Sequence, residues 1–185
     1  EFMDYGIASF DTTSPLIRAF KDQRSNFFTS NEKGKIEYFT SIRIPQALEN
    51  RQLGYAVQEG QYRQEDLQEM ECKALSSLRA YANHSIGLEG ALSAILTYTE
   101  TFLRAKKTTE VTVQKKMAKF EEDYRRTLIN RPWQTCDEAL CRGQSVEAAI
   151  FRGNNRNRRR GMHNLTVFYK HLNYMKEKKA NGNGY

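Results

Sequence analysis

The chain has few of the side chains that carry most enzyme and metal chemistry. Its three cysteines are an odd and low number, which fits a reducing compartment better than a disulfide framework. Three histidines, at His84, His163 and His171, leave few positions for a general base. Cys136 and Cys141 precede His163 and His171, but the two histidines lie too far apart for a zinc-ligand pair. We therefore expect no metal site and two small buried cysteines.

Short catalytic motifs are also missing from the sequence. It contains no glycine loop of the phosphate-binding form, and no G-x-S-x-G, H-E-x-x-H or C-x-x-C. The neighbouring carboxylates Glu121, Glu122 and Asp123 lie in a lysine-rich segment, where ion pairing explains them. These absences predict a protein that is not an enzyme and that uses no cofactor.

Long apolar runs are absent, which argues against a membrane-spanning helix. No basic-then-apolar leader opens the sequence, and Glu1-Phe2 ahead of Met3 resemble residues left by cloning. The composition, 39% hydrophobic and 28% charged, predicts one intracellular domain over residues 14–179, in the cytoplasm or nucleus. Residues 1–13 are expected to form a disordered arm, and residues 180–185 a disordered tail.

Apolar residues recur at spacings of three and four along most of the chain, which is typical of amphipathic helices. Proline, threonine, serine and asparagine at the starts of these patterns predict the helix boundaries. The predicted fold is mainly α, a compact bundle of about six to seven helices. These cover approximately residues 14–24, 45–53, 61–83, 85–103 and 109–129, two short segments between 133 and 153, and a last helix capped by Asn164.

A different periodicity occurs near the N-terminus. Residues 36–44 alternate between apolar and polar side chains after the sequence Asn31-Glu32-Lys33-Gly34, and Phe27 to Ser30 precede this turn. A period of two behind a turn that ends in glycine indicates a β-hairpin. Because the segment is short and mixed in character, a helix is the competing interpretation.

Five arginines lie within the stretch 152–161, which has no acidic or apolar side chain before Gly161: Arg152, Arg156, Arg158, Arg159 and Arg160. Glycine and asparagine disfavour helix, so the stretch is predicted to be a flexible loop. Planar guanidinium groups suit phosphate oxygens, and the loop is therefore a candidate for phosphate contacts. A solvated surface loop is the alternative.

Other basic side chains are predicted to add to this surface. Lys115, Lys119 and Arg126 fall on one exposed stripe of the helix that starts at Thr109, as expected for a helix along a phosphate backbone. A merely solvated face explains the stripe about as well. On the last helix, Lys170 and Tyr174 point away from the apolar side, and Tyr174 is a candidate for stacking on a base.

The charges are unevenly distributed. Residues 104–131 hold nine Lys and Arg against four Asp and Glu, and residues 151–185 hold nine against one. Such asymmetry indicates an anionic partner or head-to-tail association between copies. We predict a non-enzymatic nucleic-acid-binding protein, with RNA favoured over DNA, which could form a homo-oligomer as nucleocapsid-like or silencing-suppressor-like proteins do. The alternatives are a protein–protein adaptor for an acidic partner, or, less expected, a peripheral binder of anionic membranes.

Overall fold

A computed structural model describes residues 12–21, 24–30, 34–134 and 145–180. Within these ranges it contains six α-helices, one short 3-10 helix and four short strands. The helices are α1 (Ser14–Phe20), α2 (Arg51–Gln58), α3 (Gln64–Ala82), α4 (Leu88–Arg104), α5 (Glu110–Asn130) and α6 (Gly153–Ala180). The 3-10 helix is η2 (Ser145–Ala149). The mainly α prediction is confirmed.

The predicted hairpin is present, and the helical alternative for it is wrong. Strand β1 (Phe27–Ser30) pairs antiparallel with β2 (Ile36–Phe39), with Phe27 opposite Phe39. The alternating segment is not one strand, because after Thr40 the chain continues into β3 (Ile42–Arg43). This strand pairs in parallel with β4 (Ile150–Phe151), more than a hundred residues away. Two segments distant in sequence are therefore tied together beside the hairpin.

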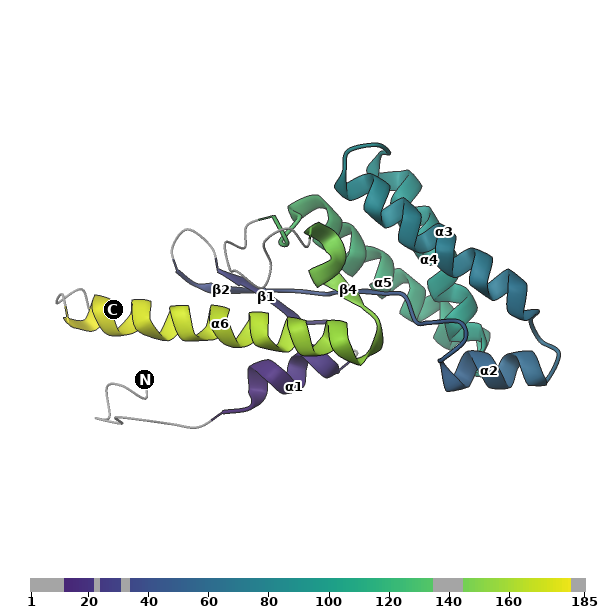
Figure 1. Ribbon diagram of the computed structural model, residues 1–185, viewed down its shortest axis with the longest axis horizontal. Helices are drawn as coiled ribbons and strands as arrows, with labels where there is room; N and C mark the ends of the chain where they lie inside the picture. Colours follow the sequence, from purple (N-terminus) through teal and green to yellow (C-terminus); the bar gives the residue numbers. More distant parts are fainter. Residues whose placement is uncertain (1–11, 22–23, 31–33, 135–144, 181–185) are drawn as a thin grey trace.

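The helices form two groups around a shared core (Figure 1). Helices α3, α4 and α5 pack side by side in one group, while α1 and the hairpin pack against α6 in the other. Strand β2 contacts both α5 and α6 and so lies between the groups. Phe27, Ile42, Tyr98 and Tyr124 are fully or almost fully buried and join the groups in one hydrophobic cluster.

Several predicted helix boundaries need correction. Pro45 does not open a helix; α2 starts later, at Arg51, because the side chain of Asn50 accepts hydrogen bonds from the backbone N–H groups of Gln52 and Leu53. Ser85 does not cap α4, whose N-cap is Gly87. Thr109 is the N-cap residue of α5, as predicted, although its side chain makes no capping hydrogen bond.

Asn164 was predicted to cap the last helix, but it lies inside α6 and is fully buried. Its side-chain amide donates to the carbonyls of Pro15 and Asn26, and its oxygen accepts from the N–H of Phe28. A buried asparagine with these partners serves tertiary packing rather than capping. The same contacts join α6 to α1 and β1.

The predicted arm and tail, and the short helix expected to end at Gly143, lie almost wholly outside the described residues. The helix predicted between Ser145 and Gly153 is instead η2 followed by β4. No described helix combines the length and apolar character needed to cross a bilayer.

Candidate nucleic-acid interface

The arginine-rich stretch is not a loop. Gly153, with φ of +56°, begins α6, and the helix continues through the remaining arginines. Low intrinsic helix propensity is outweighed here by tertiary contacts, since Asn157, Arg160 and Asn164 are all buried on one side of α6. The stretch is therefore rigid helix, with its arginines pointing in different directions.

Two of the five arginines are neutralised by carboxylates of the same chain. Arg152 forms an ion pair with Glu71 of α3, which also accepts a hydrogen bond from the N–H of Ala47 at 2.7 Å. Arg156 pairs with Glu147 of η2, which is shared with Arg79. In these positions the two guanidiniums hold elements of the fold together.

Arg160 is fully buried. Its guanidinium donates to the carbonyls of Ile150 and Ala19 and to the side-chain oxygen of Asn157, and it lies over the ring of Phe151. Burial lowers the pKa of this group. A side chain in this position contacts protein on all sides and is not exposed to a ligand.

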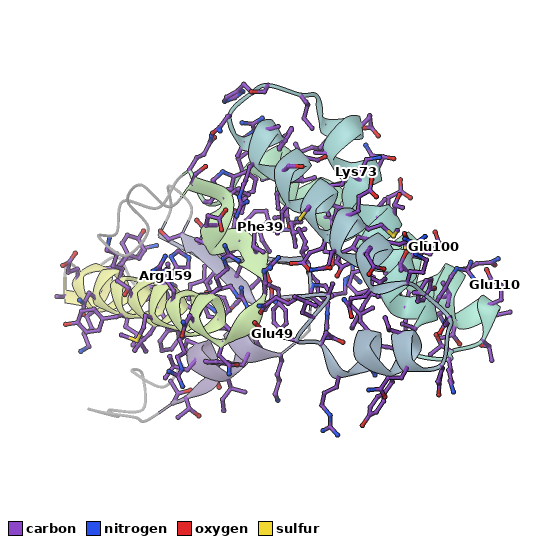
Figure 2. All side chains as sticks on the ribbon, turned by 45° about the vertical axis from the view of Figure 1, so that its right-hand side comes forward. Phe39, Glu49, Lys73, Glu100, Glu110 and Arg159 are labelled. Carbon is purple, nitrogen blue, oxygen red and sulfur yellow. The ribbon has the colours of Figure 1, made fainter. Side chains whose placement is uncertain are left out.

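Arg158 and Arg159 are the exposed members of the stretch. Arg159 lies on α6 at the left of the view, whereas Glu100 of α4 and Glu110 of α5 lie at the right (Figure 2). The proposed phosphate contacts of this segment therefore reduce to two side chains, and they stay a prediction.

The predicted stripe on α5 is exposed at Lys115, Lys119 and Arg126. Arg126 is nevertheless occupied, because it donates to the carbonyl of Tyr38 at 3.0 Å and lies 4.6 Å over the ring of Phe39. It attaches α5 to β2. The two lysines lie further toward the N-terminus of the helix.

Lys170 and Tyr174 are exposed on α6, as expected. The ring of Tyr174 packs closely on Gly34, where an added Cβ would lie 2.7 Å from the ring. His171 contacts the carbonyl of the same glycine through Nδ1 at 2.6 Å. Gly34, at the tip of the hairpin, thus covers part of the ring of Tyr174, the residue that was predicted to stack on a base.

A cavity of about 430 Å³ lies between the end of α4, the middle of α5, and Arg24 and Thr40, which flank the hairpin in sequence. Of the predicted residues, only Lys119 lines it. The sequence interpretation missed three other basic side chains that meet there: Arg24, Lys106 and Lys116. A signal existed on α5, because Lys116, Lys119 and Asp123 are spaced for one helix face. Lys106 and Arg24 reach the cavity only through tertiary packing.

The cations of this cavity have different electrostatic environments. Arg24 donates to both carboxylate oxygens of Asp123, at 2.6 and 2.7 Å, and this pairing raises the pKa of Arg24. Burial and the nearby cations Arg43 and Lys116 lower the pKa of Lys106 to about 8. Lys106 stands 4.4 Å over the ring of Phe102.

The described residues contain no group of three or more histidine, cysteine and acidic side chains that could hold a metal ion. His163 contacts the carbonyl of Phe28 and stacks on Phe27, so its ring takes part in packing. Cys136 and Cys141 lie outside the described residues.

Comparison with known proteins gives one informative similarity. No protein-family model matches the chain. A DNA-guanine transglycosylase from Salmonella montevideo is 35% identical over 174 residues, which are 94% of this chain. The match covers 39% of the relative, so the chain spans about two fifths of the length of the curated relative it matches.

This similarity overturns the functional prediction made from the sequence. The relative's name describes an enzyme and specifies DNA, which contradicts a non-enzymatic, RNA-binding protein of the nucleocapsid or silencing-suppressor kind. The prediction failed because the motifs that are missing belong to other chemistries. The chain is similar, over nearly all of its length, to part of a DNA-guanine transglycosylase.

Proposed function

We propose that this chain takes part in the exchange of guanine bases in DNA, as part of a transglycosylase that holds the DNA strand. The observation that carries the proposal is the 35% identity over 174 residues to a DNA-guanine transglycosylase. Because the match covers 94% of the chain, it includes nearly all of the helices and strands described above. DNA is accordingly the nucleic acid proposed as partner.

Base exchange sets physical requirements on the protein. The glycosidic bond between C1′ of the deoxyribose and the guanine breaks, a new bond forms between C1′ and the incoming base, and the phosphodiester backbone stays intact. An enzyme that acts on a base in a duplex must first extrude it from the stack. The flanking backbone must be held while the base is out, and this requires cationic side chains that face the phosphates.

The distribution of charge in the structure is consistent with this role. Two arginines toward the C-terminal ends of α4 and α5 are paired with carboxylates: Arg104 with Glu100 and Glu110, and Arg125 with Glu89. The lysines of the cavity between α4 and α5 have no such pairing among the salt bridges of the described residues. Uncompensated positive charge next to a hollow is what a backbone-holding surface needs.

An isotope-exchange measurement tests the proposal directly. Radiolabelled free guanine is incubated with the protein and unlabelled duplex DNA, and the DNA is then precipitated and counted. Exchange of guanine for guanine leaves the DNA unchanged in free energy, so label is expected to enter it. RNA of the same sequence and labelled adenine serve as controls, and neither is expected to give incorporation.

DNA binding is measured in the same samples by fluorescence anisotropy of an end-labelled duplex. Binding with no incorporation would assign the chain to holding DNA and would remove base exchange from its own activity. If the protein neither binds the duplex nor incorporates label, the proposed function is wrong. Equal incorporation into RNA would overturn the choice of DNA.

A further inference from the structure

The cavity between α4 and α5 gathers positive charge from three parts of the chain. Arg24 comes from the segment before β1, Lys106 from the turn after α4, and Lys116 and Lys119 from one face of α5. Asp123 is the one carboxylate among the lining residues. At about 430 Å³ the cavity falls within the size range of ligand sites in proteins.

The single carboxylate is already used. Asp123 is largely buried, and both of its oxygens accept hydrogen bonds from Arg24, which also approaches Glu122 at 3.4 Å. This pairing fixes the guanidinium at the edge of the cavity. Both oxygens of Asp123 are therefore engaged by Arg24, and Asp123 forms no salt bridge with Lys116 or Lys119 on the same face of α5 among the described residues.

Lys106, Lys116 and Lys119 line the same cavity and form no salt bridge with an acidic side chain among the described residues. Lys106 is half-buried, and its neighbours Arg43 and Lys116 both disfavour its charge. Phe102 offsets part of this cost, because Lys106 and Arg43 both lie over its ring, at 4.4 and 4.6 Å. Crowded like charges at a partly dry site are destabilising unless an anion binds between them.

The lining also contains apolar side chains. Leu103 and Phe120 lie among the cations. Apolar walls reduce the competition of water for the charged groups, which strengthens their attraction for an anion. Lysine ammonium groups bind phosphate oxygens as point charges, without the planar geometry that a carboxylate–arginine pair requires.

We propose that Lys106, Lys116 and Lys119, with Arg24 at the edge, form a phosphate-binding site that holds one backbone phosphodiester of the DNA strand. That the bound phosphate belongs to DNA rests on the proposed function. That the cavity binds a phosphate group at all rests on its volume and its cationic side chains. Free inorganic phosphate would meet the same side chains, so the experiment includes it as a separate arm.

The test compares two double variants of equal charge. Lys116→Gln with Lys119→Gln removes two exposed cations from the cavity. Lys73→Gln with Lys176→Gln removes two exposed cations from α3 and α6, outside it. All four lysines are on helix surfaces, where glutamine is tolerated with small changes in stability. Circular dichroism and thermal unfolding verify that both proteins fold.

Affinity for an end-labelled DNA duplex is measured by fluorescence anisotropy at several salt concentrations. The cavity variant is expected to lose at least about fivefold in affinity. Its slope of log K against log salt should also become shallower by about one, as expected for one lost phosphate contact. The control variant is expected to lose less than about twofold. Equal losses in both variants would show a simple dependence on net charge and would overturn the site.

The second arm measures thermal unfolding in sodium phosphate against sodium chloride at matched ionic strength. Stabilisation of the wild type and the control variant, but not of the cavity variant, supports the phosphate site. If this pattern appears while the wild type fails to bind DNA, the phosphate site stands and the DNA source fails together with the proposed function. Absence of both DNA binding and phosphate stabilisation overturns the inference.

Discussion

The guanidinium of Arg160 donates a hydrogen bond to the backbone carbonyl of Ala19, which lies near the end of α1. The last carbonyls of a helix lack intrahelical partners and carry partial negative charge, so they are suitable acceptors for a buried cation. Through the carbonyl of Ile150 the same side chain also reaches β4. One residue of α6 thus fixes a helix and a strand from distant parts of the sequence.

Truncating this side chain is expected to destabilise the protein strongly. Arg160→Ala leaves two buried carbonyls without a donor and opens a cavity, and we expect a loss of at least about 2 kcal/mol in the free energy of unfolding. Arg160→Met is expected to cost less, because it fills the space and removes a buried charge that forms no salt bridge with a carboxylate of the described residues. Urea unfolding measures both. Arg158→Ala, an exposed neighbour, should change stability by less than about 0.5 kcal/mol.

Asn164 provides a second test of the polar core. Asn164→Ala removes the partners of Phe28 N–H and of the Pro15 and Asn26 carbonyls, and should cost about 2–4 kcal/mol. Asn164→Asp keeps an acceptor for the N–H of Phe28 but places a carboxylate oxygen against the carbonyls of Pro15 and Asn26. The free energy of unfolding should therefore fall at neutral pH by at least as much as in Asn164→Ala. Asn155→Ala, in the exposed first turn of α6, is the control. A small effect of Asn164→Ala would show that the network is dispensable.

These polar contacts also explain what the sequence could and could not predict. The hairpin, α1 and α5 follow from local signals: a period of two, Pro15 at a helix start, and an apolar stripe that begins after Thr109. The arginine stretch was mispredicted because local propensity was the only available guide. Its helix depends on Ala19 and Phe28, which lie more than a hundred residues away in the sequence.

The candidate site shows the same limit. The exposed stripe of α5 could be predicted from periodicity, and Lys119, which belongs to it, lines the cavity. The convergence of Lys106 and Arg24 on the same cavity depends on how α4, α5 and the hairpin pack. Charge counts were also misleading, because Arg152 pairs with Glu71 of α3 and Arg156 pairs with Glu147 of η2. Neither carboxylate lies within the arginine-rich stretch. A count of arginines does not show which of them are neutralised.

The contact between Gly34 and Tyr174 predicts a coupling between the hairpin and α6. Gly34→Ala forces alanine to φ of +67° and places its Cβ 2.7 Å from the tyrosine ring, so we expect a loss of about 1–3 kcal/mol. Gly60→Ala separates the two causes, because Gly60 has φ of +73° but open space around it. It should show the backbone strain alone, about 1 kcal/mol.

A double-mutant cycle completes this test. In a Tyr174→Ala background the clash at Gly34 is absent, so Gly34→Ala should cost no more there than Gly60→Ala does. The cycle should therefore give a coupling of at least about 0.5 kcal/mol. Strict additivity, measured by urea unfolding, would contradict the packing of Tyr174 on the hairpin.

The charge of Lys106 predicts a pH-dependent stability. Its pKa is about 8 in the folded chain, against 10.5 as the ordinary value. Between these values the unfolded chain binds more protons, so the contribution of Lys106 to the free energy of unfolding rises with pH across this window. Lys106→Gln should thus stabilise the protein below pH 8, and its advantage should vanish toward pH 10.5. Thermal unfolding across the range measures the difference, with Lys107→Gln, which removes an exposed ion pair with Glu59, as control.

The same titration should appear in DNA affinity if the cavity holds a phosphodiester. The groups that face Lys106 are Arg43, Lys116 and the other cations of the cavity, together with the Asp123 carboxylate, which is paired with Arg24. The phosphodiester keeps its charge in this range, and burial and neighbouring cations lower the pKa of Lys106 to about 8, so Lys106 is expected to lose its charge here. An oligonucleotide of adenine and cytosine, whose bases stay neutral here, isolates this effect.

Affinity for that oligonucleotide should fall several-fold between pH 7 and pH 9 in the wild type, because the neutral amine of Lys106 attracts the phosphodiester less. Lys106→Gln should bind weakly at both pH values and show a flat profile. Lys73→Gln, on the exposed surface of α3, should keep the wild-type fall. If the affinity of Lys106→Gln falls as much as that of the wild type between pH 7 and pH 9, another group titrates and the proposed role of Lys106 is wrong. A lysine with a purely structural role would change the stability of the protein but not the pH dependence of DNA binding.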